Sequence, residues 1–559
     1  MINYNAMWTW MDQRPLVYFC LVGGLITLAL ILAILPLLRD PSDEKRSHDW
    51  IWGILIVAIL AAGRWPSILL PRELCPDEGQ MLAGARALTY DPVFWRSVDG
   101  GTAGPMDFFA LWPAAGVFGW QTFLTVRMTG LVLLSITLVV AHQCMTLVLG
   151  KKIARVASLS AVCLEALTIA PDLLHYSTEL VSMAMLTVAA YAACRRWLFQ
   201  PSPLWNGLGG LLLGAIPLAK IQAIPLAGCL GVGWLVAEFF AARADRARRI
   251  TYLLAGALLP FSLFAWQLTL AGEWNSFFIS YILSNIQYSG FSKRTLSQLL
   301  IAMFENSTQA DSLLDLWVPG SLIWLVLTLR PRISGDRAIR GFILAGCAAT
   351  LLALYCISFT RQDFLHYWQL AIIPVTFLIG ACIGNLRSAS PQSWLQWNRW
   401  LMATCVLGLV GTLLVHRARK PNPFMGFHAI FEQSPHTALS SCIIPHVHPG
   451  DALAIWGWSN YVYVETGLRQ ATRDTVVYIF VEAGPYRDYY RQRFLNDFIN
   501  ALPAFFLDSI GPCSAIYRRA EYAHDRKFPA LAAVIRSHYI LVEEMNGARL
   551  YQRQDLINR

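Results

Sequence analysis

Apolar runs that are long enough to cross a lipid bilayer recur along this chain between residues 15 and 416. A helix of about 20 apolar residues spans the hydrocarbon core of a membrane. The segment 424–559 contains no run of that length. Only 14% of the residues are charged, whereas soluble proteins carry charge on about 25% of theirs. The sequence therefore predicts an all-α, multi-pass membrane domain followed by one polar domain.

We expect about twelve membrane-spanning helices, with the usual error of a few residues at each end. The expected spans cover residues 15–38, 50–70, 124–148, 156–174, 178–198, 205–219, 223–241, 250–271, 313–329, 341–359, 369–386 and 400–416. No small-residue cleavage site follows the first run, so we expect it to be retained. The runs predict an extra N-terminal helix with its loop at 1–49, a membrane domain at 50–420 with a large first loop at 71–123, and a polar domain at 421–559.

Lys and Arg cluster in alternate loops, which the positive-inside rule places in the cytoplasm. The clusters are Arg39, Lys45 and Arg46; Lys151, Lys152 and Arg155; Arg195 and Arg196; Arg243, Arg246, Arg248 and Arg249; Arg330, Arg332, Arg337 and Arg340; Arg387 and Arg399. The rule puts both termini and the loops 71–123, 272–312, 360–368 and 424–559 outside. The cluster Arg417, Arg419 and Lys420 disagrees, which a bound phosphate or lipid headgroup would explain, as would an odd number of spans. The net charge of +9 arises from such short clusters and not from one basic face, so it does not indicate a nucleic-acid partner.

The C-terminal region has the pattern of a small α/β domain. Ala452–Trp456 is predicted as a strand and Tyr486–Leu502 as a helix, and a hairpin is predicted around Asn546–Gly547. Cys442 and Cys513 are the only cysteines in this region. They form a disulfide candidate if the domain lies in an oxidising compartment, and the alternative is two free thiols.

Two adjacent carboxylates, Asp77 and Glu78, follow the second expected span. A carboxylate that is held within hydrogen-bond reach of a hydroxyl can act as a general base, and its neighbour could orient substrate. The alternative is a solvated helix start in which Asp77 caps the helix after Pro76. A pair of carboxylates also permits a divalent metal, but nothing in the sequence requires one.

Polar residues interrupt three other apolar stretches at the same expected depth near the outer face. Asp172, Tyr176 and Glu179 would share one face of a helix that begins early enough, although helix capping by Ser177 or Thr178 explains the segment equally well. The second group is Lys220 and Gln222, and the third is Arg361, Asp363, His366 and Tyr367. An unpaired charge in the membrane is costly, and snorkelling to the interface is the alternative. We therefore expect Lys220, Arg361 and His366 to converge on one phosphate.

With these elements placed, residues 50–420 resemble GT-C glycosyltransferases of the protein O-mannosyltransferase and aminoarabinose lipid A transferase type, known as glycosyltransferase family 39. The segments that carry the resemblance are Asp77-Glu78, Gly104-Pro105, Arg127, Tyr176–Glu179, Ala219–Gln222 and His366-Tyr367 followed by Pro374. The outer segment Asp451–Trp458 looks like the C-terminal domain of bacterial members. The extra span at 15–38 departs from the family pattern.

The resemblance implies a bacterial inner-membrane enzyme whose active site and C-terminal domain face the periplasm. It implies a polyprenyl-phosphate-linked sugar donor, inversion at the anomeric carbon, and a general base at Asp77. Lys220, Gln222, Arg361, His366 and Tyr367 would then bind the donor phosphate. Arg127, Tyr176 and Glu179 would line the substrate cavity. The acceptor could be a glycolipid, a polysaccharide or a protein.

Two other functions remain open from the sequence. A transporter or flippase of lipid-linked sugars would also use many spans and intramembrane charges, but it predicts repeated halves, and the sequence shows no clear repeat. A membrane anchor that presents the polar domain to a partner predicts spans without polar groups. The polar residues at three outer helix ends argue against such an anchor.

Overall fold

The computed structural model describes residues 15–39, 49–168, 170–199, 202–241, 245–289, 297–298, 337–358, 364–389, 436–512 and 514–557. Its contacts divide the chain into two compact units. We call residues 1–67, 130–263 and 289–430 the membrane unit, and residues 68–129, 264–288 and 431–559 the sheet unit. The large first loop therefore groups with the C-terminal region, which the order of the segments along the chain did not predict. The boundary expected near residue 420 lies outside the described residues.

Six helices in the described part of the chain are long and apolar enough to cross a membrane, which confirms the multi-pass helical prediction. These spans are Trp50–Leu69, Leu124–Leu149, Ile221–Phe240, Arg246–Ala271, Ile339–Ser358 and Leu365–Asn385. Shorter apolar helices cover Cys20–Pro36 and Leu204–Leu218. The spans expected at 313–329 and 400–416 lie outside the described residues, so the total of about twelve stays a prediction.

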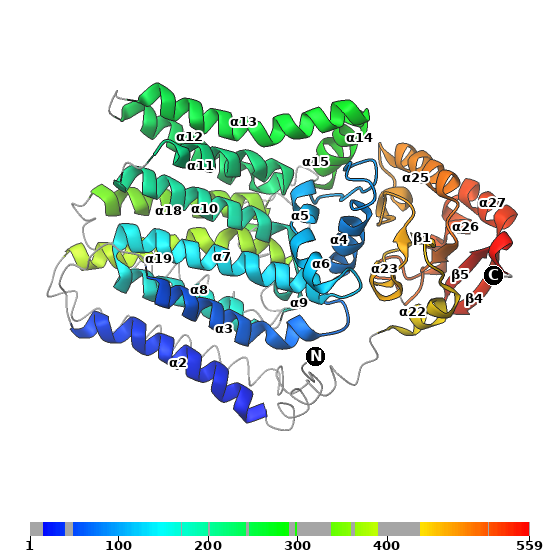
Figure 1. Ribbon diagram of the computed structural model, residues 1–559, viewed down its shortest axis with the longest axis horizontal. Helices are drawn as coiled ribbons and strands as arrows, with labels where there is room; N and C mark the ends of the chain where they lie inside the picture. The colour runs from blue at the N-terminus through cyan, green and yellow to red at the C-terminus, as the bar shows by residue number, and fades with distance from the viewer. Residues whose placement is uncertain are drawn as a thin grey trace. The chain divides into compact units, whose positions relative to one another are not determined.

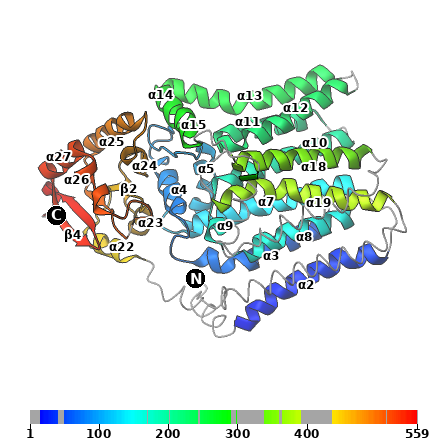
Figure 2. The same cartoon turned by 180° about the vertical axis from the view of Figure 1, so that it is seen from behind.

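The helices that contribute to the membrane unit run side by side in Figures 1 and 2. They are α2 (Pro15–Arg39), α3 (Trp50–Leu69), α7 (Leu124–Leu149), α8 (Lys151–Leu167), α9 (Pro171–Leu174), α10 (Thr178–Phe199), α11 (Leu204–Ala215), α12 (Ile224–Phe240), α13 (Arg246–Ala271), α18 (Arg337–Ser358) and α19 (Gln369–Ala389). Two short 3-10 turns, η1 (Ile216–Leu218) and η2 (Ile221–Ala223), join α11 to α12, and η4 (Leu365–Trp368) precedes α19.

Helix α19 lies in the interior of the membrane unit. It packs against α8, α10 and α18, and 89% of the residues in its span window are buried, against 17% for α13. A helix that is apolar on all sides is stable only when protein or lipid covers it. Protein therefore covers α19, whereas most of α13 is left for lipid.

The segment expected as one span at 156–174 is not a continuous helix. Helix α8 ends at Leu167, the single turn α9 follows, and α10 begins at Thr178 with Glu179 in its first turn. His175, between α9 and α10, has extended backbone angles. The expectation that Asp172, Tyr176 and Glu179 share one helical face is therefore wrong, because the helix begins only after Tyr176.

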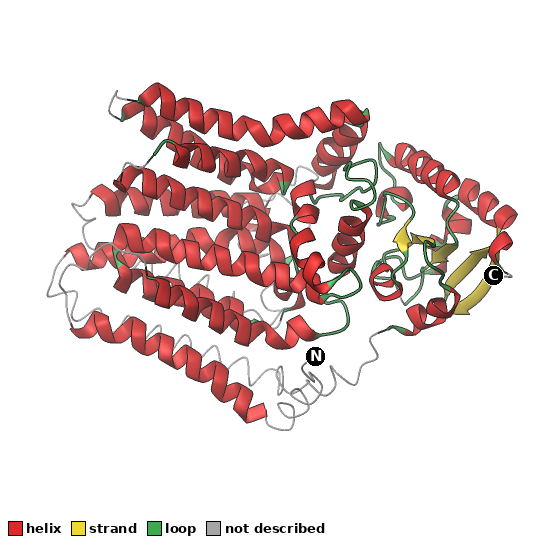
Figure 3. Ribbon diagram, in the orientation of Figure 1, coloured by secondary structure: helices red, strands yellow, loops and turns green. Residues whose placement is uncertain are grey.

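The sheet unit combines short helices with one five-stranded sheet, as Figure 3 shows. The strands are β1 (Ala452–Trp456), β2 (Arg469–Gln470), β3 (Phe505–Asp508), β4 (Tyr539–Met545) and β5 (Ala548–Arg553), in the order β2-β1-β3-β5-β4. β1 pairs in parallel with β2 and β3, and β5 pairs antiparallel with β3 and β4. The predicted strand at 452–456 and the predicted hairpin are confirmed, with Asn546 and Gly547 both at positive φ in the turn.

Twelve short helices in the described part of the chain complete the sheet unit. They are α4 (Pro76–Ala87), α5 (Pro105–Phe109), α6 (Trp112–Phe118), α14 (Trp274–Phe277), the π-helix η3 (Phe278–Leu283), α15 (Ser284–Ser289), α22 (Ala438–Ile443), α23 (Tyr461–Thr466), α24 (Tyr478–Val481), α25 (Arg487–Ala501), α26 (His524–Lys527) and α27 (Pro529–His538). The predicted helix at 486–502 is α25. The core contains the aromatic side chains of Trp456, Phe480, Phe494, Phe498 and Phe506.

Candidate functional site

In the membrane unit, several of the polar groups that the sequence singled out lie in contact with one another. Lys220 lies between η1 and η2, with its Nζ 3.0 Å from Oε1 of Glu179 and 2.7 Å from the Thr178 hydroxyl. The same Nζ lies 5.4 Å from the centre of the Tyr367 ring. Lys220, Glu179 and Tyr367 are all buried. We call this group, with Asp172, Gln222 and His366, the polar cluster of the membrane unit.

His366 joins the polar cluster through Asp172. Its Nδ1 lies 3.0 Å from Oδ1 of Asp172, and its backbone N–H donates to Oδ2 at 3.1 Å. The rings of His175 and His366 are nearly perpendicular, and their centres lie 5.3 Å apart. The single turn α9 carries Asp172, and η4 carries His366, so the break between α8 and α10 presents Asp172 to η4.

The structure corrects the expectation that Lys220 has no partner in the protein. Glu179 supplies a buried carboxylate to it, so the costly charge is already compensated within the chain. Arg361, the third cation expected here, lies outside the described residues. Gln222 differs from Lys220, because its buried Nε2 has no hydrogen-bond partner among the described residues. Tyr176 is fully buried.

An ion pair that was not predicted from the sequence supports the polar cluster. Arg64 of α3 and Glu165 of α8 form a salt bridge and are both buried. Arg64 also donates to the backbone carbonyls of Glu165, at 2.9 Å, and of Leu173, at 3.0 Å. Since Leu173 directly follows Asp172 in α9, this arginine holds the turn that carries Asp172. The signal was present in the sequence, because each charge interrupts an apolar helix.

In the sheet unit, Asp77 and Glu78 open helix α4 but have different surroundings. Glu78 is fully buried, and it accepts hydrogen bonds from Nε of Arg127 at 3.0 Å, from Nη2 of Arg127 at 2.8 Å and from the backbone of Leu74 at 2.9 Å. Asp77 is only half-buried. The N-cap residue is Cys75, so Asp77 does not cap the helix. The pair does lie in the first turn of α4, as the helix-start alternative expects, but only Asp77 is partly exposed.

Arg127 is occupied by contacts that hold this corner of the sheet unit. Besides Glu78, it donates to the backbone carbonyls of Leu70 and Arg72. A buried guanidinium with this many acceptors fixes the chain between α3 and α4. We therefore assign Arg127 and Glu78 to positioning the first turn of α4, which carries Asp77.

Glu73 is a further acidic group beside this pair. Burial raises its pKa to about 8, and the neighbouring carboxylates of Glu78 and Glu465 add to the rise. Its Oε2 is buried and has no hydrogen-bond partner among the described residues. Glu465 lies on α23, which packs against α4. The sequence did not predict the shifted pKa of Glu73, because this shift comes first from burial and then from neighbouring carboxylates, one of which, Glu465, is distant in the sequence.

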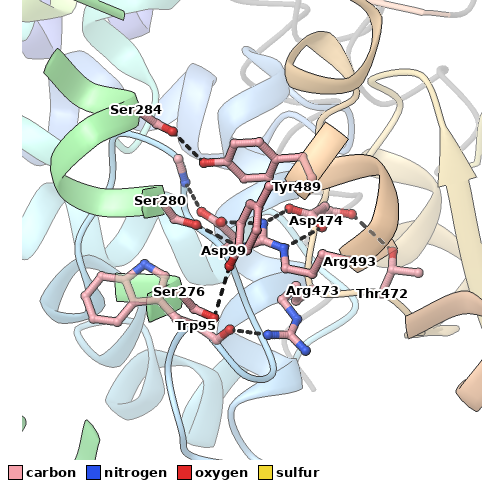
Figure 4. Close-up of polar contacts among 12 residues, drawn as sticks. Trp95, Asp99, Ser276, Ser280, Ser284, Thr472, Arg473, Asp474, Tyr489 and Arg493 are labelled. Atoms are coloured by element: carbon pink, nitrogen blue, oxygen red, sulfur yellow. Dashed lines mark hydrogen bonds and ion pairs between the residues drawn. The ribbon is translucent and has the colours of Figure 1, made fainter. Parts of the chain in front are cut away.

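A second buried network ties together three segments of the sheet unit (Figure 4). The guanidinium of Arg493 reaches Oδ2 of Asp99 at 2.5 Å and Oγ of Ser280 at 2.8 Å, and it also pairs with Asp474. Burial raises the pKa of Asp474 to about 7, and Asp99 adds to this although Arg493 opposes it. Arg473 donates to the carbonyl of Trp95 at 2.7 Å. The large first loop, η3 and α25 are thus joined around one arginine.

Asp508, His524 and Asp525 form a possible metal-ligand group in the sheet unit. Asp508 already accepts from His524 Nδ1 at 2.6 Å and from Arg549 at 2.8 Å, and Arg549 also pairs with Asp525 at 3.0 Å. The guanidinium therefore already supplies the positive charge that these carboxylates need. The disulfide candidate is not tested, because Cys442 makes no disulfide with a described residue and Cys513 lies outside the described residues.

No protein-family model and no curated protein matches the sequence. Solved structures do match. The crystal structure of ArnT from Cupriavidus metallidurans bound to undecaprenyl phosphate aligns with a TM-score of 0.56 and 15% identity, over 90% of this chain and 98% of that one. The apo state of the same protein aligns with a TM-score of 0.53 and 14% identity over the same shares. At such low identity the likeness shows the fold. The chain therefore has the GT-C fold that its sequence resemblance implies.

Proposed function

We propose that this chain is a glycosyltransferase that transfers a sugar from a polyprenyl-phosphate donor to a hydroxyl group on the outer face of a bacterial inner membrane. The observation that supports the proposal is the polar cluster, in which segments far apart in the sequence bring Lys220 to Glu179 and His366 to Asp172. Gln222 follows Lys220 by two positions, and its buried Nε2 has no hydrogen-bond partner among the described residues. ArnT, which shares the fold, binds undecaprenyl phosphate. A lipid-linked donor also suits a site formed by membrane helices.

The proposed reaction gives each group a role. The acceptor oxygen attacks the anomeric carbon with inversion, and the bond from that carbon to the phosphate oxygen breaks with its electron pair going to the phosphate. The hydroxyl proton goes to the carboxylate of Asp77 as general base. Lys220 and His366 would stabilise the charge that develops on the leaving phosphate. Glu78 and Arg127 act only by positioning Asp77.

The decisive experiment is a transfer assay with purified protein in nanodiscs, a polyprenyl-phosphate sugar and a panel of glycolipid, polysaccharide and peptide acceptors. Asp77→Asn should lower turnover at least about 100-fold, because it keeps the shape of the side chain and removes its basicity. Asp91→Asn is the matched control, since Asp91 lies in the same loop but pairs with Arg96 at the surface. Its turnover should stay near that of the wild type. Near-normal turnover of folded Asp77→Asn would reject the base assignment, and donor translocation without transfer would favour a flippase.

A further inference from the structure

We infer that the sheet unit contains a saccharide-binding site in the cavity between α15 and α24–α25. The cavity has a volume of about 130 Å³. One water molecule needs roughly 10–15 Å³ of such space, so there is room for a sugar ring. The inference concerns binding alone and goes beyond the proposed transfer reaction.

Aromatic rings form much of the cavity wall. Tyr288 comes from α15, Tyr478 from α24, Tyr486 precedes α25, and Tyr490 lies on α25. Tyrosine presents an apolar ring face and a hydroxyl that can hydrogen-bond. A pyranose has the complementary surface, because its C–H groups form apolar patches and its hydroxyls point outward from the ring. Rings from three elements therefore match one sugar unit better than they match a fully hydrated ion.

Polar groups of several kinds line the same cavity. Glu482 accepts from the Tyr517 hydroxyl through Oε1 at 2.7 Å, and its Oε2 takes no hydrogen bond from a described residue. Gln287 offers an amide, and Arg487 has a buried Nε with no hydrogen-bond partner among the described residues. A cavity that offers both donors and acceptors suits the hydroxyl groups of a ligand, because each hydroxyl can donate and accept hydrogen bonds. An aliphatic chain would leave these groups unpaired, and Glu482 would repel a polyanion.

The wall of the cavity is held in place before any ligand binds. The hydroxyl of Tyr490 is hydrogen-bonded to Ser284 at 2.6 Å, and the guanidinium of Arg493 lies 4.6 Å from the centre of the Tyr490 ring. Arg493 is fixed in turn by the network with Asp99, Ser280 and Asp474 that Figure 4 shows. A preorganised wall reduces the ordering cost of binding.

Gly484 keeps the cavity open. A Cβ atom at this position would come within 2.7 Å of Nε2 of Gln287. A larger side chain would therefore push into the space between Gln287 and Glu482. Since Gly484 is exposed and has no positive φ, such a change should fill the cavity without straining the backbone.

The test measures the binding of lactose, maltose and N,N′-diacetylchitobiose to the full-length protein in nanodiscs by saturation-transfer NMR and calorimetry. At least one disaccharide should bind the wild type. Gln287→Ala and Glu482→Gln should each weaken that binding at least about fivefold, as the loss of one hydrogen bond predicts, and Gly484→Leu should abolish it. Gln492→Ala is the control, because Gln492 is exposed and its amide donates to Asn496 on the same helix.

Two results would overturn the inference. One is a wild-type protein that binds none of the disaccharides, and the other is binding that Gly484→Leu and Gln287→Ala leave unchanged. Binding of inorganic phosphate at the cavity with no saccharide binding would also overturn it and would identify an anion site through Arg487. Each of these results can occur in a protein with full transfer activity, so the failure of this inference is distinguishable from the failure of the proposed function.

Discussion

Single residues in this protein acquire their roles from their partners. Lys220 and Gln222 stand two positions apart, but the lysine is paired with Glu179 whereas the amide nitrogen of Gln222 has no hydrogen-bond partner among the described residues. A buried cation that already has a carboxylate can still face a phosphate, because an ammonium group has three donors. The pair therefore contributes both to the stability of the membrane unit and, in our proposal, to donor binding.

These two contributions of Lys220 can be separated. Lys220→Ala should lower the free energy of unfolding by about 3–5 kcal/mol, because it leaves the Glu179 carboxylate buried without its cation. The double variant Lys220→Met with Glu179→Gln removes both charges and should recover most of that stability. Both variants should bind a polyprenyl-phosphate sugar at least about tenfold more weakly than the wild type, if the ammonium forms one charge-assisted hydrogen bond to phosphate. Thermal unfolding and donor affinity in nanodiscs check this, and unchanged donor affinity in the double variant would remove Lys220 from the donor site.

Glu73 should make the stability of the protein depend on pH. Its pKa is about 8 in the folded chain and about 4.3 in an unfolded chain. Between about pH 4.3 and about pH 8 the folded state binds more protons than the unfolded state. The free energy of unfolding therefore falls as pH rises through this range, and it falls no further through this group above about pH 8. Glu73→Gln should match the wild type in melting temperature near pH 4 and exceed it increasingly up to pH 8. Glu521→Gln, at an exposed site, should show no such trend. If the melting temperatures of Glu73→Gln and the wild type differ by the same amount at every pH, the shifted pKa is contradicted.

At the scale of elements, two short helices set the place of the candidate base. Helix α4 carries Asp77 and packs against α23, and the contact is possible because residue 79 is glycine. A Cβ atom on Gly79 would lie 2.7 Å from the backbone nitrogen of Tyr461 and 2.8 Å from the carbonyl carbon of Asn460. Backbone atoms cannot move aside as a flexible side chain can, so the helices would have to separate.

Gly79→Ala should therefore destabilise the sheet unit by about 1–3 kcal/mol, the usual cost of overpacking, and should lower turnover by displacing Asp77. Gly116→Ala is the matched control, because Gly116 also lies in a short helix but has nothing within 4 Å of its added Cβ. That control should be slightly stabilising, since alanine favours a helix more than glycine does. Thermal unfolding and the transfer assay check both variants, and equal behaviour of the two would mean that α4 and α23 are not in close contact.

At the scale of the whole molecule, the sheet unit is assembled from three separate stretches of chain, 68–129, 264–288 and 431–559. Arg493 contacts one residue from each of the first two stretches, Asp99 and Ser280, and one from its own, Asp474. Removing a buried cation leaves its carboxylates uncompensated, which is far more costly than losing a surface ion pair. The assembly of these stretches should thus depend on this single side chain.

Arg493→Ala should lower the free energy of unfolding by about 3–5 kcal/mol and should increase hydrogen exchange in residues 95–101 and 276–284 together. Arg519→Ala removes an exposed arginine that pairs with Glu521, and it should leave exchange in both segments unchanged. Mass spectrometry of peptides from the two variants measures this directly. Faster exchange in only one of the two segments would show that other contacts join the stretches.

Features that depend on composition and short-range patterns can be predicted from the amino-acid sequence alone. Runs of apolar residues predict membrane helices wherever they occur, and Asn546-Gly547 predicts its tight turn because both residues tolerate positive φ. The short strand β3 was missed, since its place between β1 and β5 depends on both neighbours. The polar segments at 77–78, 176–179, 220–222 and 366–367 were likewise visible as interruptions of apolar patterns.

Which of these groups contact one another depends on the packing of the folded chain. Lys220 pairs with Glu179, which lies 41 positions earlier in the chain, and Arg493 pairs with Asp99, which lies 394 positions earlier. Charge partners at such separations depend on which faces of the helices and loops pack together, and local patterns do not specify this. The same reason explains why Arg127 and Glu78, both expected to act on substrate, are bound to each other. Burial then sets the electrostatics, because a carboxylate such as Glu73 changes its pKa only when the fold removes water and brings other carboxylates near.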